Sequence, residues 1–192
     1  MQEYHNFPSG AAAAHKHPRG GGWVADTAYV EASVFVDRNA KVFDNAIVFG
    51  YVHIFDRAQV FGNAAVTDDA TIYGNALIFN GAQISDDVRV CDNAIVSGNA
   101  VICDNVQVRN KSVVTGNAVV SGNIQLNGHL VDQPFISVRR SDQYDFCFVD
   151  GKILAGCRNF SVEEAYAHWD SDNYRNQQLR KETVKILDFL TK

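Results

Sequence analysis

The residues best suited to ligand recognition lie near the end of the chain, where arginines occur among aromatic side chains. They are Arg139, Arg140, Tyr144, Arg158, His168 and Trp169. Guanidinium groups bind phosphate and carboxylate groups through paired hydrogen bonds, and aromatic rings stack on bases or cations. These residue types predict a site for a small anionic, nucleotide-like ligand. The alternative is structural, with Trp169 in a core and the arginines balanced by Asp142, Asp145 and Asp150.

Other residues with chemical potential are more scattered. The His15-Lys16-His17 segment has the alternate spacing with which two imidazoles on one strand can hold a metal, but in a Gly/Ala-rich terminal segment it is more often an ordinary solvated stretch. The cysteines Cys91, Cys103, Cys147 and Cys157 form no CxxC pair and no zinc-ligand spacing. We therefore interpret them as reduced structural thiols, and we expect no metal site and no cofactor.

Length and charge limit the class of protein. The 192 residues suffice for one sizeable domain and a small one, and the net charge of −5 argues against sequence-independent nucleic-acid binding. No run of about 18 apolar residues could cross a membrane, and residues 1–20 lack the pattern of a signal peptide. These features predict a cytoplasmic protein without a membrane partner.

A period of six residues dominates residues 21–128, as in NAIVFG, YVHIFD and RAQVFG. The fourth place of each hexad is Val, Ile or Leu, the second is mostly Ala or Val, and Gly, Asp and Asn gather where hexads join. Because a strand points alternate residues to opposite sides, the second and fourth places face inward and the third and fifth outward. Three strands would close a triangular coil, so eighteen hexads predict six stacked coils.

This pattern resembles the hexapeptide-repeat family, and the resemblance implies a left-handed parallel β-helix that assembles as a homotrimer. The segment AGCRNFSVEEAYAHW resembles a C-terminal module that follows such repeats in bacterial and prophage proteins of the transferase-like type. GGGWVADTAYV, at the start of the repeat, resembles the entry motif of the same group. The prophage link favours a protein that binds or sequesters something in the host cell.

The outward places carry an unusual number of apolar residues for a monomer. The residues that we predict to form a trimer interface are Phe43, Phe49, Phe61, Phe79, Ile47 and Ile95. Phenylalanines stacked at coil spacing can also stabilise the prism itself. A continuous apolar surface nevertheless implies a partner, and identical chains around a three-fold axis are the simplest one.

The resemblance also raises the question of catalysis. Hexapeptide acyltransferases usually carry a histidine base in the cleft between subunits, and His53 is the only outward histidine of the repeat. The alternative for His53 is simple packing near Phe35 and Phe55. Carbonic anhydrases of this fold need three histidines around zinc, and the repeat lacks a second outward histidine to help build such a set.

Beyond Gly128 the period stops and a small α+β module is predicted. Strands are expected near residues 135–140, 144–149 and 152–156, with Asp150-Gly151 as a tight turn. Ser161 and Glu164 form a capping box that opens the helix SVEEAYAHW, and a second helix should span residues 176–190. The expected organisation is a cap segment at 1–20, an all-β left-handed parallel β-helix at 21–128 and an α+β module at 129–192.

Three functional hypotheses follow. The first is a non-catalytic homotrimer that binds or sequesters a small anionic ligand or a protein partner, with a phage connection. The second is an acyltransferase that uses His53 as its base. The third is a purely structural or assembly protein. The sequence favours binding over catalysis, because His53 is the only candidate base that it offers within the repeat.

Overall fold

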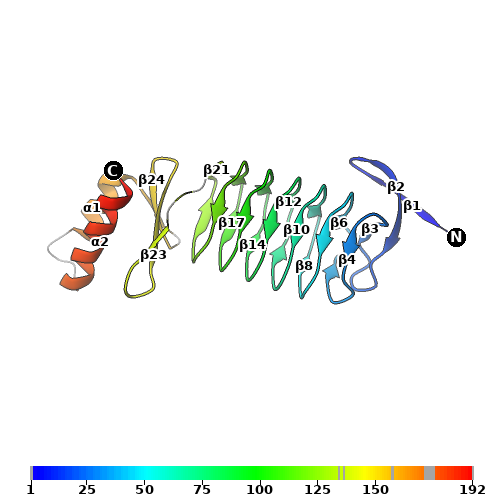
Figure 1. The fold of residues 1–192 in the computed structure, drawn as a ribbon, viewed down its shortest axis with the longest axis horizontal. Coiled ribbons are helices and arrows are strands. Elements are labelled where there is room, and N and C mark those ends of the chain that lie inside the picture. Colours follow the sequence, from blue (N-terminus) through cyan, green and yellow to red (C-terminus); the bar gives the residue numbers. More distant parts are fainter. Residues whose placement is uncertain (1, 134, 136, 157, 171–175, 192) are drawn as a thin grey trace.

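The chain forms an elongated molecule in which a stack of short strands lies between a hairpin at one end and a small α+β module at the other (Figure 1). The computed structural model describes residues 2–133, 135, 137–156, 158–170 and 176–191. Strand β1 (Glu3–Phe7) and helix α2 (Gln177–Leu190) lie at opposite ends of the long axis (Figure 1).

Three parallel sheets form the stack, and we call them face 1, face 2 and face 3. Face 1 contains β3 (Trp23–Ala25), β6 (Lys41–Val42), β9 (Gln59–Val60), β12 (Leu77–Ile78), β15 (Ile95–Val96), β18 (Val113–Val114) and β21 (Leu130–Val131). Face 2 contains β4 (Tyr29–Val30), β7 (Ile47–Val48), β10 (Ala65–Val66), β13 (Gln83–Ile84), β16 (Val101–Ile102) and β19 (Val119–Val120). Face 3 contains β5 (Phe35–Val36), β8 (His53–Ile54), β11 (Thr71–Ile72), β14 (Arg89–Val90), β17 (Gln107–Arg109) and β20 (Gln125–Asn127). A parallel β-solenoid of about six turns is thereby confirmed, while its left-handedness stays a prediction from the resemblance.

The interior of the solenoid is built from the second and fourth places of each hexad, as predicted. Ala46 and Val48 are fully buried, and so are Val52 and Ile54 in the following hexad. Alternation of a small and a larger aliphatic side chain fills a narrow interior at the density of a protein core. A single apolar core therefore runs along the whole stack.

The corners explain why Gly, Asp and Asn recur at the sixth place. The backbone is left-handed there, with φ of +57° at Asp44 and +73° at Gly74. The carboxylate of Asp56 accepts a hydrogen bond from the Gly74 amide one turn further along, at 3.0 Å. A Cβ on Gly74 itself would lie 2.8 Å from the backbone nitrogen of Asp92 in the next turn. The sixth place thus favours glycine or a short side chain such as that of Asp56, which bonds to the adjacent corner.

The N-terminal segment is a hairpin that extends face 1 and leans against its outer side. β1 pairs antiparallel with β2 (Gly10–Lys16), and β2 pairs antiparallel with β3. Phe7 packs with Phe43 in a small separate core, and the Ser9 hydroxyl donates to the Asp44 carboxylate at 2.8 Å. The ring of His5 stacks on Trp23 with centroids 4.5 Å apart.

The surroundings of His5 make this contact sensitive to protonation. Burial and the positive charges of Lys41 and Lys16 lower the pKa of His5. The ammonium group of Lys16 lies 4.0 Å from the centre of the Trp23 ring, on which His5 also stacks. The docked hairpin therefore favours neutral His5.

The solenoid continues one strand beyond the last hexad. β21 pairs with β18, but Leu130 lies opposite Val113, seventeen residues away, whereas Val113 lies opposite Ile95 at the regular distance of eighteen. One residue is therefore missing from the corner between β20 and β21. The outward and inward alternation survives, because Leu130 is exposed and Val131 is buried.

The C-terminal module consists of a four-stranded antiparallel sheet, which we call the end sheet, and two helices. The end sheet contains β22 (Ser137–Arg139), β23 (Asp145–Val149), β24 (Lys152–Ala155) and β25 (Arg158–Phe160), and it is followed by α1 (Val162–Trp169) and α2. Three strands and both helices were predicted, and β25 was not. Residues 134 and 136 of the first predicted strand lie outside the described residues. The capping box is confirmed, because Ser161 accepts from the Glu164 amide and Glu164 accepts from the Ser161 amide.

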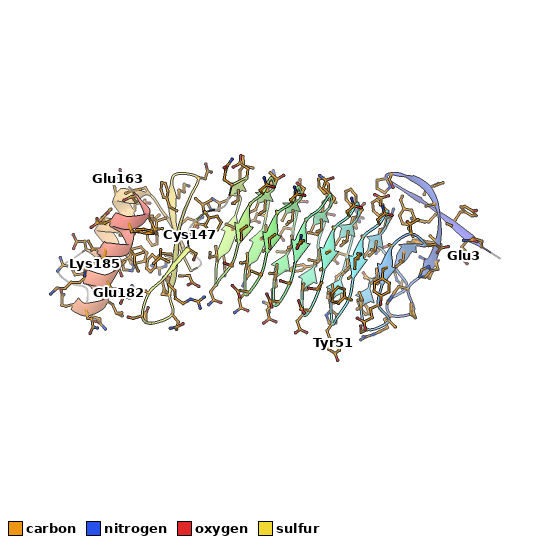
Figure 2. The ribbon with its side chains drawn as sticks, viewed as in Figure 1. Glu3, Tyr51, Cys147, Glu163, Glu182 and Lys185 are labelled. Atoms are coloured by element: carbon orange, nitrogen blue, oxygen red, sulfur yellow. The ribbon has the colours of Figure 1, made fainter. Side chains whose placement is uncertain are left out.

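The end sheet lies between the last turn of the solenoid and the helices. Cys147, Val149 and Leu154 join the solenoid core, and Figure 2 shows Cys147 between the two parts. Phe146 points to the other side and packs with Trp169 beneath the helices. The end sheet therefore covers the open end of the stack, whose unpaired strands and apolar core would otherwise meet solvent.

Candidate functional site

Arg139 is part of the connection between the end sheet and the solenoid. Its guanidinium donates to both carboxylate oxygens of Asp145, at 2.7 and 3.1 Å, and Asp145 also accepts from the Asn123 amide at 2.8 Å. Burial would raise the pKa of Asp145, but the hydrogen bonds from Arg139 and Asn123 outweigh it and the pKa lies below its usual range. Asp145 therefore holds the last corner of the stack as the repeat aspartates hold the earlier corners.

Arg140 faces the opposite side of the end sheet. Only 5% of its surface is exposed, and it donates to both oxygens of Asp142 at 2.8 Å and to the Thr183 hydroxyl at 2.7 Å. The Tyr144 hydroxyl donates to the backbone oxygen of Ala155 at 3.0 Å, and Trp169 is buried against Phe146. These three side chains were predicted to bind an anion. In the structure, their polar atoms or rings are directed at other parts of the protein.

The remaining two residues of the predicted anion site lie at the surface. His168 stacks on Phe160 with centroids 5.3 Å apart, beside an open cavity that Asn159 and Glu164 also line. Arg158 is exposed on β25. Arg139 pairs with Asp145, which bonds to the last turn, whereas Arg140 contacts α2, so the six residues are not brought together in one pocket.

His53 lies on face 3 within a row of aromatic rings. Its ring is 5.6 Å from that of Phe55 and nearly parallel to it, and 6.1 Å from that of Phe35. Within the described part of the chain, no carboxylate or hydroxyl is hydrogen-bonded to the His53 ring to orient it as a base. The geometry agrees with the packing alternative for His53.

The two N-terminal histidines have separate partners. His15 Nδ1 lies 2.9 Å from a carboxylate oxygen of Asp26, whereas buried His17 directs Nε2 to the backbone oxygen of Glu31 at 3.2 Å. A carbonyl oxygen only accepts, so Nε2 of His17 carries the hydrogen. The pair does not converge on a common point, and the metal interpretation gains no support.

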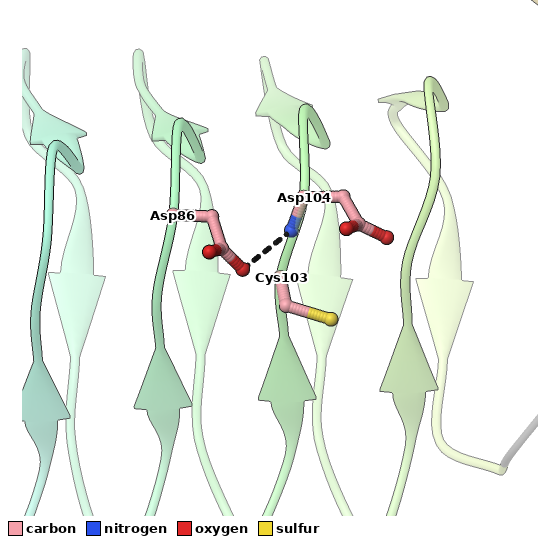
Figure 3. A group of neighbouring side chains, drawn as sticks. All are labelled: Asp86, Cys103 and Asp104. Atoms are coloured by element: carbon pink, nitrogen blue, oxygen red, sulfur yellow. Dashed lines mark hydrogen bonds between the residues drawn. The ribbon is translucent and has the colours of Figure 1, made fainter.

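One group of side chains has the composition of a metal site, namely Asp86, Cys103 and Asp104 (Figure 3). The Asp86 carboxylate, however, accepts from the Asp104 backbone amide at 3.0 Å, which is the ordinary corner bond of this solenoid. Burial and the carboxylates of Asp104 and Asp86 raise the pKa of the Cys103 thiol, and burial raises the pKa of Cys147 to about 12. These thiols stay protonated near neutral pH, as their structural interpretation requires, and Cys157 lies outside the described residues.

Face 2 carries the largest group of exposed apolar side chains near the N-terminal end, which we call the aromatic patch. Its members and their exposed fractions are Tyr29 (59%), Ile47 (45%), Phe49 (43%) and Tyr51 (68%). Tyr29 lies directly opposite Ile47 in the strand register, and Figure 2 shows Tyr51 projecting from the edge of the solenoid. Two of the predicted interface residues, Ile47 and Phe49, therefore stand exposed in one place.

Face 1 carries a column of stacked phenylalanines. Phe7, Phe43, Phe61 and Phe79 follow one another with ring centroids 5.0, 4.7 and 4.9 Å apart. Only 1% of Phe43 is exposed, because the N-terminal hairpin places Phe7 over it, so the expectation that Phe43 is open to a partner is wrong for the single chain. Phe61, Phe79 and Ile95 remain half-buried on the outer side of face 1.

A cavity of about 190 Å³, which we call the junction cavity, opens where the solenoid meets the end sheet. It is lined by Leu130, Val131, Asp132, Gln133, Phe135, Phe148, Val149 and Asp150. This cavity was not predicted from the sequence, because its two halves are distant in the chain and meet only when the end sheet docks. The sequence indicates such a cavity only through two outward apolar residues that each precede an aspartate by two positions, namely Leu130 before Asp132 and Phe148 before Asp150.

Comparison with known proteins agrees with the fold. Residues 88–104 match the family model described as the YdcK beta solenoid repeat, which makes this segment similar to that repeat. No curated protein and no solved structure matches the chain. Among the described helices, none is long and apolar enough to cross a membrane. The fold therefore defines a β-solenoid repeat protein with a capped end.

Proposed function

We propose that the protein is a non-catalytic, homotrimeric β-solenoid that acts in the cytoplasm by binding a protein partner. The aromatic patch on face 2 carries the proposal. Tyrosine, phenylalanine and isoleucine side chains exposed side by side are typical of protein interfaces and rare on the surface of a monomer. Regular packing of the solenoid does not require them, since serine and threonine stand at equivalent outward places of face 2 at Ser85 and Thr67.

A trimer needs two different apolar surfaces on each chain. In a cyclic trimer each subunit uses one surface toward one neighbour and another surface toward the other neighbour. The aromatic patch supplies the first surface, and half-buried Phe61, Phe79 and Ile95 on face 1 supply the second. Burial of both in an assembly would remove apolar area from water without any change in the fold.

A protein partner is better supported than a small anion. Arg139 and Arg140 are already paired with Asp145 and Asp142, so an anion would have to displace these carboxylates. The acyltransferase hypothesis rests on His53, whose ring is in contact with aromatic neighbours. The structural or assembly hypothesis shares the trimer with our proposal and differs from it only in lacking a partner.

The test is the mass of the protein in solution. We expect light scattering to give about three times the chain mass of 21.2 kDa for the wild type and a single chain mass for the Ile47→Glu/Phe49→Glu double variant. Two carboxylates in an apolar interface would lose hydration without a partner. Thr71→Glu, at an outward place on face 3, is the matched control and should remain trimeric. A monomeric wild type would refute the assembly.

A further inference from the structure

The junction cavity has an apolar floor that is unusually open to solvent. Leu130 is 55% exposed and Phe148 is 36% exposed, although each comes from a strand whose neighbouring residues are buried. Val131 and Val149 form the wall behind them and belong to the solenoid core. The floor is therefore fixed by the docking of the end sheet on the last turn.

Two carboxylates stand at this floor, one on each side of the junction. Asp132 follows β21, and Asp150 occupies the turn between β23 and β24 with φ of +52°. Within the described part of the chain, neither carboxylate forms an ion pair, and Lys152, two residues after Asp150, is paired with neither. None of the described residues that line the cavity is a cation. The cavity thus combines exposed apolar side chains at its floor with two carboxylates at its edge.

We propose that the junction cavity binds an arginine side chain that a partner protein presents next to aliphatic residues. The aliphatic part of the side chain would lie on Leu130 and Phe148, and its guanidinium would reach Asp132 and Asp150. Arginine suits the cavity better than lysine, because its planar, weakly hydrated head stacks on aromatic rings and pairs with carboxylates through two hydrogen bonds. An anion would be repelled, and a purely apolar ligand would leave two carboxylates without water.

The surface beside the cavity could also accept the aliphatic residues next to such an arginine. Leu130 lies in strand register beside Val113, another outward aliphatic residue of face 1. A basic partner is also favoured at long range by the net charge of −5. The inference rests on the proposed binding of a protein partner, but it does not depend on the aromatic patch.

The probe is the peptide acetyl-Gly-Leu-Arg-Leu-Gly-amide, followed through the NMR signals of the Leu130 and Val131 methyl groups in the full-length protein. We expect saturable shifts at both residues. A peptide with citrulline in place of arginine keeps the shape but loses the charge, and it should bind about tenfold more weakly or worse. The Asp132→Asn/Asp150→Asn variant should lose the preference for arginine, whereas Asp69→Asn on the solenoid surface should keep it.

The outcomes separate this inference from the proposed trimer. Equal affinity for the arginine and citrulline peptides, or no saturable shift at Leu130 and Val131, would overturn the arginine site even if light scattering shows a trimer. Undiminished arginine preference in the Asp132→Asn/Asp150→Asn variant would overturn it as well. Conversely, peptide binding by the monomeric Ile47→Glu/Phe49→Glu variant would support the site without supporting the trimer. A lysine peptide that binds more tightly than the arginine peptide would also contradict the assignment.

Discussion

Replacement of Asp145 by alanine should loosen the end sheet from the solenoid. The change removes two hydrogen bonds from Arg139 and the acceptor of the Asn123 amide. Because Arg139 is 49% exposed, water can replace its side of the ion pair, and we count that pair at about 0–1 kcal/mol. The amide without an acceptor costs about 1–3 kcal/mol. The expected loss in the free energy of unfolding is therefore about 1–4 kcal/mol.

Urea unfolding at one fixed protein concentration measures this loss, and hydrogen exchange of the Asn123 amide locates it. The control is Asp69→Ala, an exposed carboxylate without a hydrogen-bond partner among the described residues, which should change stability by less than about 0.5 kcal/mol. If Asp145→Ala were as stable as Asp69→Ala and its Asn123 amide exchanged at the wild-type rate, the assigned corner bond would be refuted.

The pH dependence of the unfolding free energy, compared between wild type and Asp145→Ala, supplies an independent check of the role of Asp145. The folded-state pKa of Asp145 lies below the value of about 3.9 expected for an unfolded chain. Its stabilisation is therefore present above about pH 4 and is lost as the pH falls through the folded-state pKa. The difference in unfolding free energy between wild type and Asp145→Ala should accordingly shrink in acid. A difference that stays constant down to pH 2 would contradict the charged state of Asp145.

Two other predictions concern the corners and the hairpin. Gly74→Ala should cost more than about 1 kcal/mol in urea unfolding and clearly more than Gly128→Ala, because both glycines have positive φ but only at Gly74 would the new Cβ meet backbone. Equal costs would show that strain, not crowding, selects glycine at this corner. The opening of β1, measured by hydrogen exchange corrected for the intrinsic pH dependence of amide exchange, should be steady above about pH 6.5 and rise as the pH falls below it, since protonation of His5 opposes docking, and His5→Phe should abolish this rise. A rise that persists in His5→Phe would locate the titrating group elsewhere.

The solenoid could be predicted from sequence because each place of the hexad has one local role. Buried Ala46 and Val48 and the left-handed corner at Asp44 each follow from a residue type at a fixed place in the repeat. The strand β21 could not be predicted in this way, since the chain omits one corner residue before Leu130. Burial of Phe43 was also missed, because it depends on a hairpin whose sequence has no such period.

The six residues of the predicted anion site lie apart for a different reason. Arginines and aromatic rings close together in sequence do not reveal which carboxylates they meet, and the alternative of internal pairing holds for Arg139 with Asp145 and for Arg140 with Asp142. Alternation along a strand then separates the two arginines, since neighbouring residues of β22 and its extension point to opposite sides of the end sheet. Tertiary pairing, which composition cannot show, decided the outcome.

The pairing of Arg139 also bears on where binding can occur. Asp145 continues the series of corner carboxylates that accept from the next turn, after Asp104, which accepts from the Gly122 amide at 2.8 Å. Arg139 and Asp145 therefore close the stack and are not free for a ligand. Asp132 and Asp150 lie outside this series and have no such partner among the described residues. Two carboxylates without an ion-pair partner among the described residues, beside exposed Leu130, distinguish the junction cavity from the rest of the capped end.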